Sequence, residues 1–249
     1  MGILNLTPDS FRASSRVSAA DFAARAGAML RSGADIIDVG AVSSRPGAAP
    51  VSEEEEWGRL NPALRALRSS GVACRLSIDT FRSGIVRRCY DLMGPFIVND
   101  ISAGEDDPDM LSVVGELGLT YVAMHKRGNP VTMDSLTDYP RGVVPALLEY
   151  FSGFSGKASA AGVLDWILDP GLGFAKTPVQ CLEILEGLEE LKVFGRPVLV
   201  GASHKRFTAC GLLMSDGSVL DNDAAERLAI AHGADIIRRH FDICKYFSR

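Results

Sequence analysis

Phe96-Ile-Val-Asn99-Asp100 is a short apolar run that ends in two polar residues, and similar runs recur along the whole chain. Apolar runs without polar alternation are typical of strands that are buried on both faces, as in parallel sheets. The runs lie at residues 2–5, 35–40, 75–80, 96–100, 121–125, 166–171, 197–203 and 235–240. The sequence therefore predicts eight parallel strands.

Helical patterns lie between these runs and begin at residues that cap helices well. A proline follows the cap in Asp107-Pro108 and in Thr177-Pro178, the position that proline prefers in a helix. The Gly/Ser-rich stretch at 152–159 predicts a loosened or broken helix. The expected caps are Ser18, Ser52, Asp107, Thr177 and either Asp221 or Asp223.

Alternating strands and helices favour βαβ units and a parallel sheet. A (β/α)8 TIM barrel takes about 250 residues. The chain has 249 residues and no linker, so we expect a single domain over residues 1–249. The first strand begins at Met1, which gives minimal N-terminal cover to the barrel floor, and only Phe241–Arg249 remain for a short last helix. An open doubly wound sheet tolerates such ends and is the alternative fold.

The composition narrows the class of protein. A formal net charge of −5 argues against a nucleic-acid binder, which would carry a basic domain. No apolar run approaches the roughly 18 residues of a membrane span, and no signal peptide is visible. The five cysteines are scattered without a C-x-x-C pair, which favours buried, reduced thiols and a cytoplasmic location. We therefore expect a cytoplasmic protein with small-molecule substrates, without nucleic-acid or membrane partners.

Polar side chains stand at or just past the ends of the predicted strands. In a parallel barrel the carboxyl ends of all strands meet at one rim, where such barrels keep their chemistry. One or two of these groups can be structural ion pairs, but burying all of them costs free energy unless they are matched. The set comprises Asp79, Asn99, Asp169, Lys205, Arg238 and His240.

The chemistry of the rim residues divides them into groups. Asn5 offers an amide oxygen that suits Mg²⁺, a hard cation that keeps most of its waters and bridges phosphates. A flat heterocycle with an N–H-rich edge suits Asp79, Asn99 and Asp169. Phosphate or pyrophosphate suits the cationic set of Arg45, Lys205, Arg238 and His240. These residues indicate a barrel enzyme that handles an anionic leaving group on a heterocycle.

Seven segments match, in order, the signatures of one known family. They are Met1–Phe11, Asp38–Ala48, Ser77–Thr80, Val98–Ile101, Met124-His125 with Gly128–Pro130, Asp169–Phe174 and Arg238-x-His240. In these segments, which span almost the whole chain, the sequence resembles dihydropteroate synthase. The resemblance implies a TIM barrel that condenses 6-hydroxymethyl-7,8-dihydropterin pyrophosphate with p-aminobenzoate in folate biosynthesis. It also implies Mg²⁺ as cofactor and a homodimer.

The resemblance implies a role for each rim residue. Asn5 would bind Mg²⁺, and the catalytic residues would be Asp79, Lys205 and Arg238. The pterin would contact Asp79, Asn99, Ile101, Met124, Asp169, Phe174, Gly201, Lys205 and Arg238. Pyrophosphate would contact Arg45, Arg238 and His240. The p-aminobenzoate would contact Ser44, Pro46, Phe174, Lys205 and Arg206.

The chain departs from the family pattern at a few positions. Val42 stands where the family commonly has a glutamate, His204 where it has an arginine, and Phe241 intrudes before Asp242 in the last signature. Arg206 replaces a serine that in the family helps to hold the p-aminobenzoate carboxylate. An arginine there either pairs with that carboxylate or crowds it out.

Two alternative functions stay open on these grounds. One is a catalytically weak homologue that binds pterin and pyrophosphate without making pteroate. The other is a methyltransferase-type pterin-binding barrel, which has no use for the pyrophosphate set. His125 is likewise open, since it is either a family position or a hydrogen-bonded structural histidine.

Overall fold

The computed structural model describes residues 1–6, 19–42, 50–129 and 131–241. Strands that follow one another in the sequence pair in parallel, β1 through β6 in one sheet and β7 with β8 in another. The strands are β1 (Gly2–Asn5), β2 (Ile36–Gly40), β3 (Arg75–Asp79), β4 (Ile97–Asp100), β5 (Thr120–Met124), β6 (Trp166–Asp169), β7 (Leu199–Val200) and β8 (Ile236–Ile237).

Two single bridges close the strands into a ring. Leu168 bridges to Val198 between β6 and β7, and Gly2 bridges to Arg239 between β8 and β1. At the second seam, Ile3 N donates to Arg239 O at 3.0 Å and Arg239 N donates to Met1 O at 3.0 Å. The predicted (β/α)8 barrel is confirmed, and the open doubly wound sheet is wrong.

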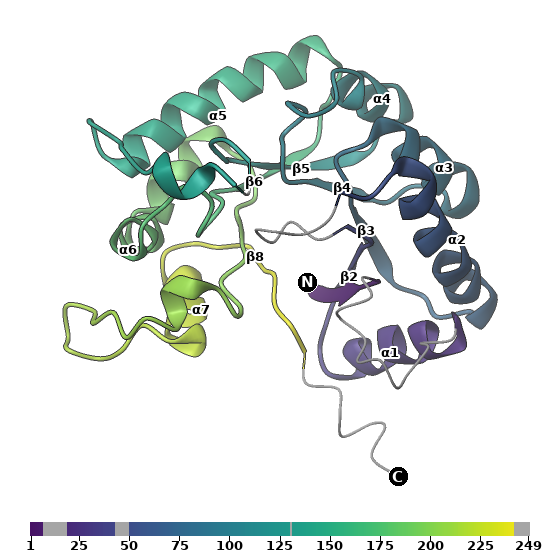
Figure 1. Ribbon diagram of the computed structural model, residues 1–249, viewed down its shortest axis with the longest axis horizontal. Helices are drawn as coiled ribbons and strands as arrows, with labels where there is room; N and C mark the ends of the chain where they lie inside the picture. The colour runs from purple at the N-terminus through teal and green to yellow at the C-terminus, as the bar shows by residue number, and fades with distance from the viewer. Residues whose placement is uncertain (7–18, 43–49, 130, 242–249) are drawn as a thin grey trace.

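The helices lie outside the ring of strands, as Figure 1 shows. They are α1 (Ala19–Arg31), α2 (Glu53–Ser70), α3 (Ser83–Met93), α4 (Met110–Leu117), α5 (Val143–Ala160), α6 (Pro178–Glu186) and α7 (Asn222–Ala231). Short 3-10 turns lie between them: η2 (Met133–Ser135), η3 (Leu188–Phe194) and η4 (Arg206–Thr208). The short last helix expected after residue 241 falls outside the described residues, as does the Ser18 cap.

Side-chain caps set the starts of three helices. The Ser52, Thr177 and Asp221 side chains accept backbone N–H bonds at the starts of α2, α6 and α7. The expected cap at Asp107 is wrong, because α4 begins at Met110. The Asp107 carboxylate instead accepts from Ser83 N at 2.7 Å and from Asp109 N at 3.0 Å, tying the loop to the start of α3.

The α5 helix runs unbroken through its Gly/Ser-rich part, so the predicted break is wrong. Its inner face is aromatic: Phe154 stacks on Tyr121 with ring centroids 5.9 Å apart and meets Trp166 edge-on at 5.0 Å. Phe151 is fully buried beside them. Burying such rings is worth several kcal/mol, which exceeds the roughly 1 kcal/mol cost of each helical glycine.

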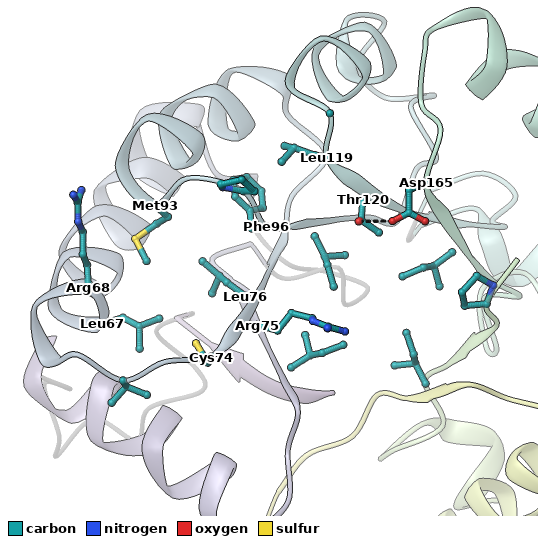
Figure 2. Close-up of a pocket in the computed structure, with 18 of the residues that line it drawn as sticks. Leu67, Arg68, Cys74, Arg75, Leu76, Met93, Phe96, Leu119, Thr120 and Asp165 are labelled. Atoms are coloured by element: carbon teal, nitrogen blue, oxygen red, sulfur yellow. Dashed lines mark hydrogen bonds between the residues drawn. The ribbon is translucent and has the colours of Figure 1, made fainter.

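A cavity lies at the amino ends of the strands, away from the rim. It has a volume of about 750 Å³ and is lined by Ile36, Arg75, Ile97, Thr120, Ile167 and Ile236, which are the first or second residues of six strands. Figure 2 shows Leu76 and Phe96 on its wall and the Thr120 hydroxyl bonded to Asp165 beside it. This cavity lies at the floor of the barrel, whereas the residues of the predicted site lie at the opposite end.

The described cysteines are free thiols. Cys89 and Cys181 are buried as expected, Cys74 is half-buried, and Cys210 is exposed, contrary to expectation. Within the described residues, none of the helices has both the length and the apolar content needed to cross a membrane.

Candidate active site

A single buried guanidinium lies among three carboxylates at the carboxyl end of the barrel. Arg238, just after β8, has Nη1 3.4 Å from Asp38 Oδ2 and 3.9 Å from Asp79 Oδ2, and its Nη2 is 4.0 Å from Asp169 Oδ2. Burial opposes the charge on Arg238, but the three carboxylates raise its pKa above its ordinary value. Residues from β2, β3, β6 and β8 thus meet at one point, as the strand-end pattern predicts.

Asp38 connects the other members of this network. The pattern of polar residues at strand ends does not predict it as a site residue. It is buried and accepts from Ser77 Oγ at 2.6 Å and from Asn99 Nδ2 at 3.0 Å. The signal was present, because a carboxylate inside a strand that is buried at every position needs partners of this kind. Asp38 orients both the Asn99 amide and the Arg238 guanidinium.

One donor of Arg238 has no partner in the described structure. The Nε atom is buried and makes no hydrogen bond there, and the guanidinium lies against Gly201, where a Cβ would come within 3.3 Å of Nε. A buried donor without an acceptor costs about 1–3 kcal/mol. The arrangement therefore suits a ligand that brings an acceptor to the mouth of the barrel.

Asp79 is the least buried of the three carboxylates and has an unusual acidity. Burial, with the Asp38 carboxylate adding to it and Arg238 opposing it, raises the pKa of Asp79 from 3.8 to about 8. The folded protein therefore holds a proton near neutral pH that an unfolded chain releases. Under this linkage, stability falls as pH rises from about 4 to about 8.

Replacing Asp79 by asparagine is expected to remove this pH dependence, because an amide has no proton to release. Thermal unfolding of the ligand-free protein between pH 5 and pH 8 measures the effect. The melting temperature of Asp79→Asn minus that of the wild type should increase as pH rises. A difference that stays constant over this range would contradict the raised pKa.

Lys205 and Phe174 form a second part of the site beside Asp169. The Lys205 Nζ donates to Leu172 O at 2.5 Å and lies 4.9 Å from the centre of the Phe174 ring. Burial lowers the pKa of Lys205 to about 8, and the Asp169 carboxylate opposes that shift. The Asp169 Oδ1 accepts from Gly171 N at 2.8 Å, which fixes the carboxylate plane.

The remaining pterin positions also lie near the strand ends. Met124 is the buried last residue of β5 and pairs in register with Asp169, while Ile101 is half-buried directly after β4. His240 lies two residues beyond Arg238, and its ring nitrogen Nδ1 is 3.3 Å from Ser203 Oγ. Its ring meets that of His204 edge-on, with centroids 5.2 Å apart.

Arg206 does not join the cluster around Arg238. Its exposed guanidinium donates two hydrogen bonds to the Asp134 carboxylate of η2, at 2.6 and 3.0 Å. The pair ties the loop after β7 to the loop after β5. The other residues expected around p-aminobenzoate and pyrophosphate, Ser44, Arg45 and Pro46, lie outside the described residues.

Asn5 ends β1 close to Asp79. A Cβ on Gly40 would lie 3.4 Å from Asn5 Oδ1 and 3.4 Å from Asp79 Oδ2, so both oxygens lie against this glycine. The described residues hold no group of three or more His, Cys, Asp or Glu side chains that fits a metal ion. A cation held mainly by waters and substrate phosphates, as Mg²⁺ usually is, needs no such group.

His125 has the contacts of a structural histidine. It is buried, its Nδ1 lies 2.8 Å from Lys176 Nζ, and the Tyr150 ring meets it edge-on at 4.7 Å. Burial, with Lys176 adding to it, lowers the pKa of His125 to about 2. The imidazole is therefore neutral at physiological pH.

A closed barrel with a buried Asp–Asn–Arg network at its carboxyl end defines the class: the chain belongs to the pterin binding enzyme family, whose model matches residues 1–240. Its similar relatives include dihydropteroate synthases. The synthase of Synechocystis sp. is 42% identical over 253 residues, which cover 96% of this chain and 84% of that protein.

Solved structures show the same likeness. The Yersinia pestis dihydropteroate synthase in a sulfonamide drug complex has a TM-score of 0.85 at 31% identity, covering 100% of this chain and 92% of that one. The Thermus thermophilus synthase in complex with 4-aminobenzoate has a TM-score of 0.80 at 34% identity, covering 98% and 88%.

Proposed function

We propose that this chain is a dihydropteroate synthase, which joins 6-hydroxymethyl-7,8-dihydropterin pyrophosphate to p-aminobenzoate and releases pyrophosphate. The observation that carries the proposal is the Arg238 network, with its carboxylates and its unpaired Nε. An N–H-rich pterin edge matches carboxylates, and an anionic leaving group matches a fixed arginine. The similarity to dihydropteroate synthases over 96% of the chain supports the same reaction.

The proposed chemistry is substitution at the pterin methylene carbon. The C–O bond to pyrophosphate breaks, the arylamine nitrogen forms the new C–N bond, and that nitrogen then loses a proton. Asp169 and Asp79 accept N–H groups of the pterin, and Asp38 holds Asn99 in place for the same edge. Arg238 and His240 stabilise the negative charge of the departing pyrophosphate. The family resemblance assigns the same role to Arg45.

We also propose that Asn5 contributes an oxygen ligand to Mg²⁺. The position of the Asn5 and Asp79 oxygens, side by side against Gly40, supports this assignment. When bound, the cation would neutralise charge on the pyrophosphate. A cytoplasmic location and a homodimer are proposed with it, the first from the free thiols and the second from the family resemblance.

The p-aminobenzoate side is where this chain differs from the family. Phe174 and Lys205 offer a ring and a cation there, and Arg206 offers a second cation, which pairs with Asp134. We propose that Asp134 competes with the substrate carboxylate for Arg206. If that competition always favoured Asp134, the chain would be the weak homologue that binds pterin and pyrophosphate without making pteroate.

Changing Asp134 to asparagine is expected to lower the KM for p-aminobenzoate about two- to fivefold, because an exposed ion pair is worth about 0.2–1 kcal/mol. The kcat and the affinity for the pterin substrate should not move. Steady-state kinetics measure both constants. Glu149→Gln, which breaks the exposed pair with Arg141, is the matched control. An unchanged or higher KM would show that Arg206 does not bind the substrate carboxylate.

The experiment that tests the proposed function is an assay of pyrophosphate release that depends on p-aminobenzoate. A methyltransferase-type barrel or a weak homologue would bind the pterin and release none.

A further inference from the structure

The loop between β6 and α6 has a contorted backbone. Gly171, Gly173 and Ala175 all have positive φ, at 68°, 77° and 53°. Gly171 also packs so tightly that a Cβ there would lie 2.0 Å from His125 O. A left-handed alanine costs about 1–2 kcal/mol, so the surroundings must hold this loop in place.

Three side chains hold the loop by its carbonyl groups. Lys205 Nζ donates to Leu172 O at 2.5 Å, Lys176 Nζ donates to Phe174 O at 2.9 Å, and Tyr139 OH donates to Ala175 O at 3.0 Å. Between two of these anchored carbonyls the chain presents the Phe174 ring to Lys205. The position of that ring therefore depends on the anchors.

Lys176 is the unusual anchor, because it is a buried cation with neutral partners. Its Nζ lies 2.8 Å from His125 Nδ1, 3.4 Å from His125 O and 2.9 Å from Phe174 O. Among the described residues it forms no ion pair with a carboxylate within 4.0 Å. Burial lowers the pKa of Lys176 to about 7. Burying a lysine in this way costs free energy, and packing alone does not require one.

The geometry of these contacts joins two loops of the mouth. His125 follows β5 and Phe174 follows β6, so the ammonium group bridges the ends of two neighbouring strands. Because His125 is neutral, its Nδ1 has a lone pair that accepts a hydrogen bond from the ammonium. Each of the three ammonium protons thus has an acceptor.

We propose that Lys176 is a positioning residue, which fixes the Phe174 carbonyl and thereby the Phe174 ring in the arylamine pocket. The proposal rests on the proposed function for the identity of the arylamine. A displacement of about 1 Å in a positioning group is enough to change rates a hundredfold. Lys176 touches no reacting atom, so its loss affects arylamine binding rather than pterin binding.

The kinetic test compares Lys176→Met with Lys157→Met, an exposed lysine on α5. The KM for p-aminobenzoate is expected to rise at least tenfold in Lys176→Met and to stay unchanged in Lys157→Met. The affinity for the pterin substrate, measured by calorimetry, should change less than threefold. Tyr139→Phe, which removes a neutral anchor of the next carbonyl, should raise the same KM about threefold.

The effect on KM must also disappear when the ring is absent. In a Phe174→Ala background, adding Lys176→Met should raise KM no further, since the ring it positions is gone. Equal effects of Lys176→Met with and without the ring would reduce Lys176 to general packing and overturn the proposal.

Amide hydrogen exchange at residues 172–176 gives a readout without turnover. Exchange there should speed up at least tenfold in Lys176→Met and remain unchanged in Lys157→Met; unchanged exchange in a folded Lys176→Met protein would overturn the proposal. If the wild type shows no arylamine-dependent turnover, the proposed function fails, while the exchange result still decides the role of Lys176.

Discussion

Replacing Arg238 by methionine is expected to abolish turnover and to weaken binding of the pterin pyrophosphate a hundred- to a thousandfold. The guanidinium lies within 4.0 Å of Asp38, Asp79 and Asp169, so its loss removes the cation that these three acidic side chains share. Truncating a charged partner in a desolvated binding site costs about 2–5 kcal/mol of binding free energy, and each 1.4 kcal/mol is a factor of about ten in affinity. Calorimetry of pterin binding and kinetics of pyrophosphate release measure the two losses.

The neighbouring residue provides the control. Arg239 pairs with Glu226 at 2.9 Å instead of facing the site. Arg239→Met should keep pterin affinity within about threefold, while thermal unfolding reports any general loss of stability in either variant. Equal losses of pterin affinity in both variants would refute the assignment of Arg238 as the centre of the site.

Replacing Asp169 by asparagine is expected to weaken pterin binding by about a hundredfold or more while the barrel stays folded. The asparagine oxygen can still accept from Gly171 N, so the loop keeps its anchor. The new amide group, however, turns donors toward Arg238 Nη2 and toward the N–H edge of the pterin. A carboxylate can accept two N–H bonds from the pterin edge, and each hydrogen bond lost to a charged group costs about 1.5–3 kcal/mol.

The same strand supplies the control for this change. Asp165 lies just before β6, at the floor of the barrel, and accepts from Thr120 Oγ1. Asp165→Asn should leave pterin affinity unchanged in the same calorimetric titration. Full affinity in Asp169→Asn would mean that the pterin binds elsewhere.

The strand ends could be predicted because parallel strands bring their carboxyl ends to one rim. Asp79, Asn99, Asp169 and Arg238 were found in this way, and they meet as expected. Asp38 was missed because it lies inside its strand, two residues before the end. A buried carboxylate signals that partners are needed, but which partners it has follows from the pairing that places it opposite Ser77.

Contacts between loops could not be predicted for a similar reason. The family resemblance assigns Arg206 to p-aminobenzoate, yet Arg206 pairs with Asp134, 72 positions earlier. Lys176 is likewise defined by its contact with His125, 51 positions away. Neither spacing nor hydrophobic pattern carries this information, because it depends on how long loops fold over the barrel mouth.

The most direct test of the proposed function is pyrophosphate release by the purified protein with Mg²⁺ and 6-hydroxymethyl-7,8-dihydropterin pyrophosphate. Release should require p-aminobenzoate, should yield 7,8-dihydropteroate in equal amount, and should vanish in Arg238→Met but persist in Arg239→Met. Tight binding of the pterin substrate without release, at any concentration of p-aminobenzoate, would contradict a synthase and identify a barrel that only binds pterin.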